Sequence, residues 1–114
     1  MKLPNMENAI IARAKIADYL LNLDHDEGGG KAKFYLAFGF TRNEWLKLAD
    51  ALRTHAETYQ VSWTEQTDFG MRYIIEGMVI TPDGRNPDIR AIWFIDNEQD
   101  FPRLVSAYAL EKKI

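Results

Sequence analysis

Residues 70–95 read GMRYIIEGMVITPDGRNPDIRAIWFI, and this stretch decides the fold. β-Branched and aromatic residues fill two runs, 71–81 and 87–95, on either side of the segment Pro82-Asp83-Gly84. Proline sets φ for the first corner of a turn and glycine accepts a positive φ, so this segment predicts a tight turn. We therefore expect two long antiparallel strands, followed across a short polar loop by a third strand over 102–110.

A fourth strand is expected upstream, because residues 60–66 alternate apolar and polar side chains as a strand with one solvated face does. Gly77, inside the run 71–81, indicates a bulge or a point of close backbone contact. Helical patterns occupy the first half of the chain. This order predicts an α+β fold with two or three N-terminal helices packed on an antiparallel meander sheet of about four strands.

The clearest helical signal begins at Thr41, an N-cap residue followed three positions later by Glu44, as in a capping box. This helix is expected to end between His55 and Tyr59, with His55 at the surface or capping the helix dipole. Its apolar positions predict one buried stripe: Trp45, Leu46, Leu48, Ala49, Leu52 and Ala56.

An earlier helix fits from about Ile10 to Asn22, because an apolar stripe that ends at Leu23 recurs at helical spacing. Residues 31–40 are too short a run for periodicity to separate helix from strand. We favour a short helix or turn there, since a helix follows immediately. Residues 111–114 are expected to fray as a tail.

The composition predicts a single domain over residues 1–114, with 46% hydrophobic residues to supply a core. Cysteine is absent, which excludes disulfides and cysteine-ligated zinc. A net charge of -3 argues against a broadly basic nucleic-acid surface, although 14 Lys and Arg residues still allow a local basic cleft. We see no signal peptide and no membrane span, so we expect a cytoplasmic protein.

The loop from Asp24 to Gly30 concentrates carboxylates around His25, but this spacing is not that of a metal site, and no cofactor motif is present. The three glycines that end it lack the P-loop pattern. Their amides, with Lys31 and Lys33 beyond them, could still hold an anion. A flexible helix stop with two solvated lysines is the simpler interpretation.

Four polar residues on neighbouring strands are the most suggestive set: Arg90, Arg103, Ser106 and Tyr108. Ser106 and Tyr108 share a face of their strand, and Arg103 points to the opposite face unless Pro102 disturbs the register. Such residues could stabilise the extra negative charge of a phosphodiester during metal-free RNA cleavage.

Cleavage would also need a base, such as His25 or Lys31. The alternative is purely structural: Tyr108 belongs to the core, and the arginines pair with carboxylates across strands. The carboxylates available for such pairs are those of Glu76, Asp88 and Asp96.

Several segments, taken in order, carry a family resemblance: KIADYLLN at 15–22, His25, GKA at 30–32, Phe34, Gly39-Phe40, Gly70, Tyr73, Gly77, PDGR at 82–85, Ile92-Trp93 and PRLVSAY at 102–108. The chain resembles a family of small bacterial domains of unknown function, common in cyanobacteria. Related sequences look like the toxin modules of the barnase, EndoU and RelE ribonuclease fold, which place the active site on the sheet.

The resemblance implies site residues at Lys15, His25, Lys31, Arg85, Arg103, Ser106 and Tyr108. Two positions depart from the family pattern: Ala109 stands where a proline is expected, and Asp26 stands after His25 in place of the usual proline. A carboxylate beside His25 would repel a phosphate.

Two functions therefore stay open. One is a toxin-like domain that binds or cleaves RNA, with catalytic residues His25, Lys31, Arg103, Ser106 and Tyr108, and with Lys15, Lys33, Arg85 and Arg90 as substrate ligands. The other is a non-catalytic module that binds a small operon-encoded partner protein over the sheet. Whether the protein is an enzyme is not decided by the sequence.

Overall fold

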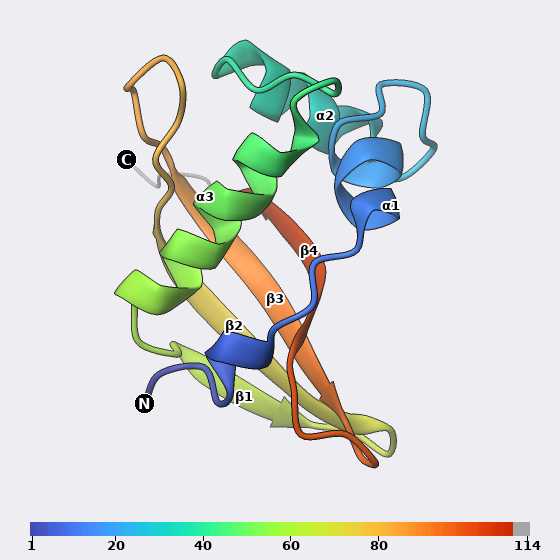
Figure 1. Ribbon diagram of the computed structural model, residues 1–114, viewed down its shortest axis with the longest axis vertical. Helices are drawn as coiled ribbons and strands as arrows, with labels where there is room; N and C mark the ends of the chain where they lie inside the picture. Colours follow the sequence, from blue (N-terminus) through green and yellow to red (C-terminus); the bar gives the residue numbers. More distant parts are fainter. Residues whose placement is uncertain (111–114) are drawn as a thin grey trace.

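The computed structural model describes residues 1–110, so the tail expected over 111–114 lies outside the described residues. Three helices pack against a four-stranded antiparallel sheet of order β1-β2-β3-β4, which confirms the predicted α+β meander (Figure 1). The elements are η1 Met6–Asn8, α1 Arg13–Lys15, η2 Ile16–Leu20, α2 Gly29–Ala37, α3 Trp45–Thr58, β1 Trp63–Gln66, β2 Gly70–Met78, β3 Asp88–Asp96 and β4 Arg103–Ala109.

The predicted hairpin is present, but its strands are shorter than the apolar runs. β2 and β3 pair without interruption from Gly70 opposite Asp96 to Met78 opposite Asp88. Beyond that point the Asn86 side chain accepts the Thr81 N–H at 2.9 Å, so a side chain replaces the ladder partner. The predicted tight turn forms at the tip of this connection, where the Gly84 N–H donates to the Thr81 carbonyl at 3.1 Å and Gly84 has a φ of 79°. Loop residues separate this turn from the ends of both strands.

One face of the sheet carries the hydrophobic core, and the helices cover it. The buried side chains of this face pack against those of α2 and α3: Ile75, Ile89, Trp93, Leu104 and Ala107 from the strands, and Tyr35, Leu48 and Leu52 from the helices. The Tyr35 hydroxyl donates to the Ala107 carbonyl at 2.8 Å. Burial, and secondarily the nearby Tyr19, raise the pKa of Tyr35 far above its usual value, so this donor stays protonated.

The first helix begins later than predicted, because Ile10 is used by the sheet. The Ile10 N–H donates to the Pro102 carbonyl at 2.8 Å, and the Ile10 carbonyl accepts the Leu104 N–H at 3.0 Å. This short parallel bridge holds the chain extended up to Arg13, where α1 begins and runs directly into the π-helical turn η2. Leu23, the expected end of the apolar stripe, is 57% exposed.

Residues 31–40, whose structure the sequence left open, are helical as far as Ala37. The capping box before α3 is only half formed. The Thr41 hydroxyl accepts the Glu44 N–H at 3.3 Å, but the residues between them form a turn and the helix starts at Trp45. The expected stripe holds except at Leu46, which is 58% exposed.

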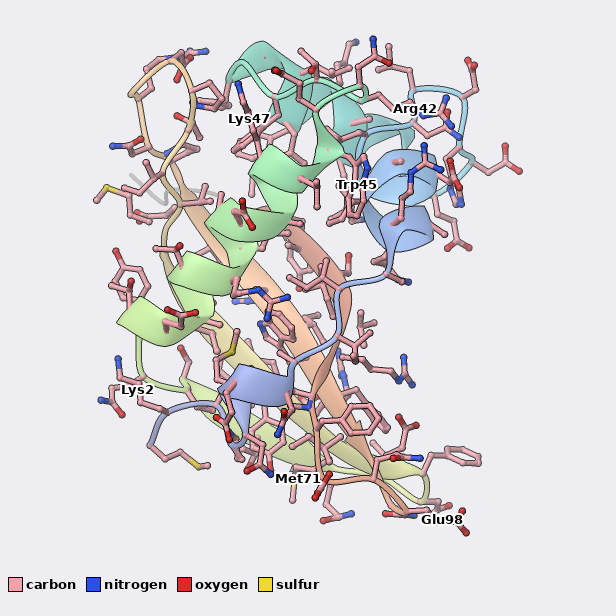
Figure 2. All side chains as sticks on the ribbon, viewed as in Figure 1. Lys2, Arg42, Trp45, Lys47, Met71 and Glu98 are labelled. Carbon is pink, nitrogen blue, oxygen red and sulfur yellow. The ribbon has the colours of Figure 1, made fainter. Side chains whose placement is uncertain are left out.

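His55 is buried, at 2% exposure, and not at the surface as expected. It lies one turn beyond Leu52 on the core side of α3, and its Nε2 forms a 3.1 Å hydrogen bond with the Gly77 carbonyl. Burial lowers the pKa of His55, against smaller opposing effects of Gly77 and Asp88. The cation at the end of α3 is instead Lys2, which donates to the Glu57 and Thr58 carbonyls at 2.9 and 2.7 Å (Figure 2).

We predict that acidification destabilises the protein through His55. Because its pKa is lower in the folded protein, the unfolded chain binds the proton more readily, and stability is lost as the pH falls below about 6.5. His55→Gln keeps a donor for Gly77 and removes the titration. Thermal melts between about pH 8 and pH 5 should therefore show a shallower decline for the variant than for the wild type. Equal slopes would contradict this role.

Gly77 is a point of close contact and not a bulge, since the β2–β3 register is continuous there. A Cβ at this position would lie 2.6 Å from ring carbons of Tyr59. We predict that Gly77→Ala lowers the free energy of unfolding by about 1–3 kcal/mol in urea titrations, because the ring must move. Gly30→Ala is the matched control: no heavy atom lies within 4 Å, so it should be neutral or stabilising.

Candidate functional site

Strand β4 carries one extra residue, Val105, where its pairing with β3 shifts by one position. Such a bulge interrupts the alternation of side chains along a strand. Arg103 therefore lies on the same face as Ser106 and Tyr108, and directly opposite Phe94 of β3. The expectation that Arg103 points to the other face is wrong for this reason. We call this face, which lies opposite the helical core, the open face.

An open cleft of about 570 Å³ lies where α1 and η2 meet the β4 edge. Helical residues, the loop after η2 and the bulged strand all contribute to its lining: Ala12, Ala14, Lys15, Asp18, Tyr19, His25, Glu27, Val105 and Ser106. The Tyr19 hydroxyl and the Ser106 hydroxyl are 3.2 Å apart and share a hydrogen bond. Tyr19 lies on the π-helical turn, a local geometry that is frequent at functional sites.

Three candidate residues gather around the Tyr19 ring. The Nζ atoms of Lys15 and Lys31 lie 5.0 and 5.4 Å from its centroid, and the His25 ring packs edge-on at 5.0 Å. Lys31 Nζ is also 5.9 Å from the Tyr108 centroid. Within residues 1–110, no carboxylate oxygen lies within 4.0 Å of either lysine. Lys31 Nζ also donates to the Glu27 carbonyl at 3.4 Å. Neither an aromatic face nor a carbonyl neutralises a positive charge, so both charges remain available to an anion.

The glycine-rich loop is packed and not a flexible stop. A Cβ at Gly28 would lie 2.3 Å from the Tyr19 carbonyl oxygen, so only glycine permits this approach. Gly29 and Gly30 already belong to α2. Because Gly28 packs against Tyr19, the first turn of α2 carries Lys31 over the Tyr19 ring.

His25 is oriented by the backbone of the same loop. Its Nδ1 accepts the N–H of Glu27 at 3.1 Å and the N–H of Gly28 at 2.9 Å. A nitrogen that accepts two amide protons carries no proton, so the neutral ring holds its proton on Nε2. His25 is consequently a hydrogen-bond donor at Nε2. A base at Nε2 would require a proton on Nδ1, facing both amides.

Carboxylates also line the cleft. Asp18 is paired with Arg42 at 2.7 Å, and Figure 2 shows Arg42 beside the first helix. Glu27 is exposed at the rim. Over residues 1–110 no three His, Cys, Asp or Glu side chains are grouped closely enough to hold a metal ion. The positive side of the cleft therefore comes from Lys15 and the Nε2–H of His25, and Lys31 lies next to the cleft over the ring of Tyr19.

Two arginines of the open face form the ion pairs expected from the structural alternative. Arg90 bonds Glu76 at 2.6 Å, and Arg103 bonds Asp96 at 2.9 Å. Hydrogen bonds from Arg103 lower the pKa of Asp96. Arg90 also lies 5.9 Å from the Tyr108 centroid, and hydrogen bonding with Tyr108 is the main cause that raises its pKa. Arg90 thus lies beside Tyr108, which Lys31 also approaches, and neither Arg90 nor Arg103 lines the cleft.

The remaining two candidates lie elsewhere. Arg85, in the β2–β3 loop, bonds Asp83 at 2.6 Å and the Ala37 carbonyl at 2.7 Å, so it fastens that loop to α2. Lys33 is exposed and lies two positions after Lys31, which directs it to another side of α2. No sequence pattern singled out Tyr19, although Lys15, Lys31 and His25 all gather around its ring.

The comparisons with known proteins agree with this fold. A chain of the contact-dependent growth inhibition toxin - immunity protein complex from Klebsiella pneumoniae 342 is similar to 89% of this chain and 99% of its own length, with 13% identity and a TM-score of 0.71. The fold is thus one that occurs in a toxin–immunity system. By its sequence, the chain belongs to the family described as a domain of unknown function (DUF6883), whose model matches residues 2–111. No curated protein sequence matches it.

No helix within the described part of the chain, residues 1–110, is both long and apolar enough to cross a membrane.

We predict that His25 is the Nε2–H tautomer at neutral pH. Long-range ¹H–¹⁵N correlation spectra distinguish a protonated from an unprotonated ring nitrogen by its ¹⁵N chemical shift. The Nδ1 of His25 should have the shift of an unprotonated nitrogen. An Nδ1–H signal would contradict the loop hydrogen bonds described above.

Proposed function

We propose that this domain is a toxin-like module that binds RNA and cleaves it without a metal ion. The observation that carries the proposal is the gathering of Lys15, Lys31 and His25 around the ring of Tyr19. Lys15, Tyr19 and His25 line one open cleft, in which the Tyr19 hydroxyl meets that of Ser106. Cations and N–H donors of this kind stabilise the charge that develops on a phosphodiester during attack. The toxin-system fold supports the same class.

In the proposed reaction the 2′-oxygen of the RNA forms a bond to phosphorus, and the bond from phosphorus to the 5′-oxygen breaks. The 2′-hydroxyl proton passes to solvent water, because His25 is arranged as a donor. Lys31 acts as a cation that stabilises the negative charge developing in the transition state. The Tyr108 hydroxyl gives a proton to the 5′-oxygen, and Arg90 beside it stabilises the resulting anion. Lys15 and His25 donate to the phosphoryl oxygens.

We predict that purified protein cleaves total RNA in the presence of EDTA, leaving 2′,3′-cyclic phosphate ends. Lys31→Ala should lower the rate by about 100-fold or more, since the loss of one group that acts in the transition state commonly costs that much. Lys33→Ala removes the same charge from the same helix outside the cleft and should cleave as the wild type does. An intact RNA ladder with the wild type would refute cleavage, and equal effects of the two substitutions would refute the assigned site.

The second candidate is a non-catalytic module that binds a small partner protein. Large apolar side chains that are open to solvent favour it, among them Phe69 at 78% exposure in the β1–β2 turn and Ile80 in the β2–β3 loop. Such side chains are common at protein interfaces. A similar fold also occurs in a complex of a toxin with its immunity protein.

We predict for this candidate that the domain co-purifies with an operon-encoded protein from its native host, and that Phe69→Ser weakens the complex in size-exclusion chromatography. Lys33→Ala changes an exposed residue of α2 and serves as the control, because it should leave the complex intact. A domain that stays monomeric and alone at micromolar concentration would count against partner binding.

A further inference from the structure

We infer that a single RNA strand lies across the open face, from the cleft to Trp63 on β1, with an unpaired base stacked on the exposed ring of Trp63. This inference rests on the proposed function and names its substrate as single-stranded. The observation behind it is a chain of alternating cations and aromatic rings, which we call the ladder: Lys15, Tyr19, Lys31, Tyr108, Arg90 and Trp63.

Each step of the ladder is a cation over a ring. From the cleft outward, Lys31 Nζ lies 5.4 Å from the Tyr19 centroid and 5.9 Å from that of Tyr108. Arg90 Cζ continues it, 5.9 Å from the Tyr108 centroid and 5.1 Å from the Trp63 ring. No gap separates the helical end of the ladder from β1.

The strand register puts the outer members on one face. Arg90 is directly opposite Tyr108, which shares its face with Ser106 of the cleft. Trp63 is opposite Ile74, which is opposite Ile92, two residues from Arg90. Trp63, Arg90 and Tyr108 therefore lie on the open face together. From β1 to β4 the ladder crosses three strand spacings, roughly 14 Å.

Trp63 is 40% exposed, whereas Trp93 on β3 is fully buried in the core, as large aromatic side chains usually are. The Trp63 ring is held in place, because its Nε1–H donates to Glu65 at 3.3 Å and Arg90 lies beside it. A fixed, solvent-facing aromatic ring is a surface on which one base of a single strand can stack.

The charges of the open face favour a single strand over a duplex. Arg90 and Arg72 are paired with Glu76 and Glu65, so the face is not a broadly basic surface of the kind that holds duplex phosphates. Its affinity must come from stacking, which needs unpaired bases. Within residues 1–110, Lys31 has no carboxylate partner, and it lies between the rings of Tyr108 and Tyr19, of which Tyr19 lines the cleft.

The test measures binding of 2′-O-methyl RNA, which cannot be cleaved, by fluorescence anisotropy. The probes are a single strand of roughly eight nucleotides, a dinucleotide and the corresponding duplex. Trp63→Ala should weaken binding of the longer strand by about 5- to 100-fold, which is the effect of losing one stacked base. The affinities for the longer strand and for the dinucleotide should therefore differ less in the variant than in the wild type. Trp63→Phe should restore most of the affinity, and the duplex should bind less well than the single strand.

Phe69→Ala is the matched control, because Phe69 is also an exposed aromatic residue near β1 but is outside the ladder. It should leave the affinity unchanged, and the melting temperatures of all variants establish that they fold. If the wild type binds and cleaves RNA but Trp63→Ala binds the longer strand as tightly as the wild type, the inference is overturned and the proposed function stands. If the wild type binds no RNA, both are overturned.

Discussion

Strand β4 is held between two tyrosine hydroxyls, and the placement of the site depends on this arrangement. On the core side Tyr35 donates to the Ala107 carbonyl, and on the open face Tyr19 meets the Ser106 hydroxyl. The two tyrosines come from η2 and α2, so both helical segments are fixed to adjacent residues of one strand. Because Lys31 lies one turn before Tyr35 on α2, the same contact that closes the core also sets the height of that lysine above the open face.

The sequence predicts the layers well, since the apolar alternation of β2 and β3 and the helical stripe of α3 are strong local signals. It does not predict where Arg103 points, because the Val105 bulge depends on how β4 pairs with β3 and leaves no mark in the alternation. His55 is misplaced for a related reason. The His55 imidazole, at a core position of α3, has its hydrogen-bond partner on another element, the Gly77 carbonyl that meets its Nε2.

The candidate residues fall into two groups that the sequence could not separate. The arginines Arg85, Arg90 and Arg103 each have a carboxylate partner, and so their charges are largely used within the fold. Lys15 and Lys31 are paired instead with the ring of Tyr19. The family resemblance indicated members of both groups, and the strand pattern added Arg90. The distances in the structure distinguish the two groups, because only the folded chain shows which cation lies within reach of a carboxylate.

The bridge at Ile10 has a consequence for assembly. An edge strand offers unpaired backbone groups on which another chain can extend the sheet. At β4 the Leu104 N–H is already taken by the Ile10 carbonyl, and the neighbouring Pro102 carbonyl by the Ile10 N–H. The first half of this edge is therefore closed to strand addition by the protein's own N-terminal segment. A partner that binds near the cleft must recognise side chains there, and not the backbone of β4 at this point.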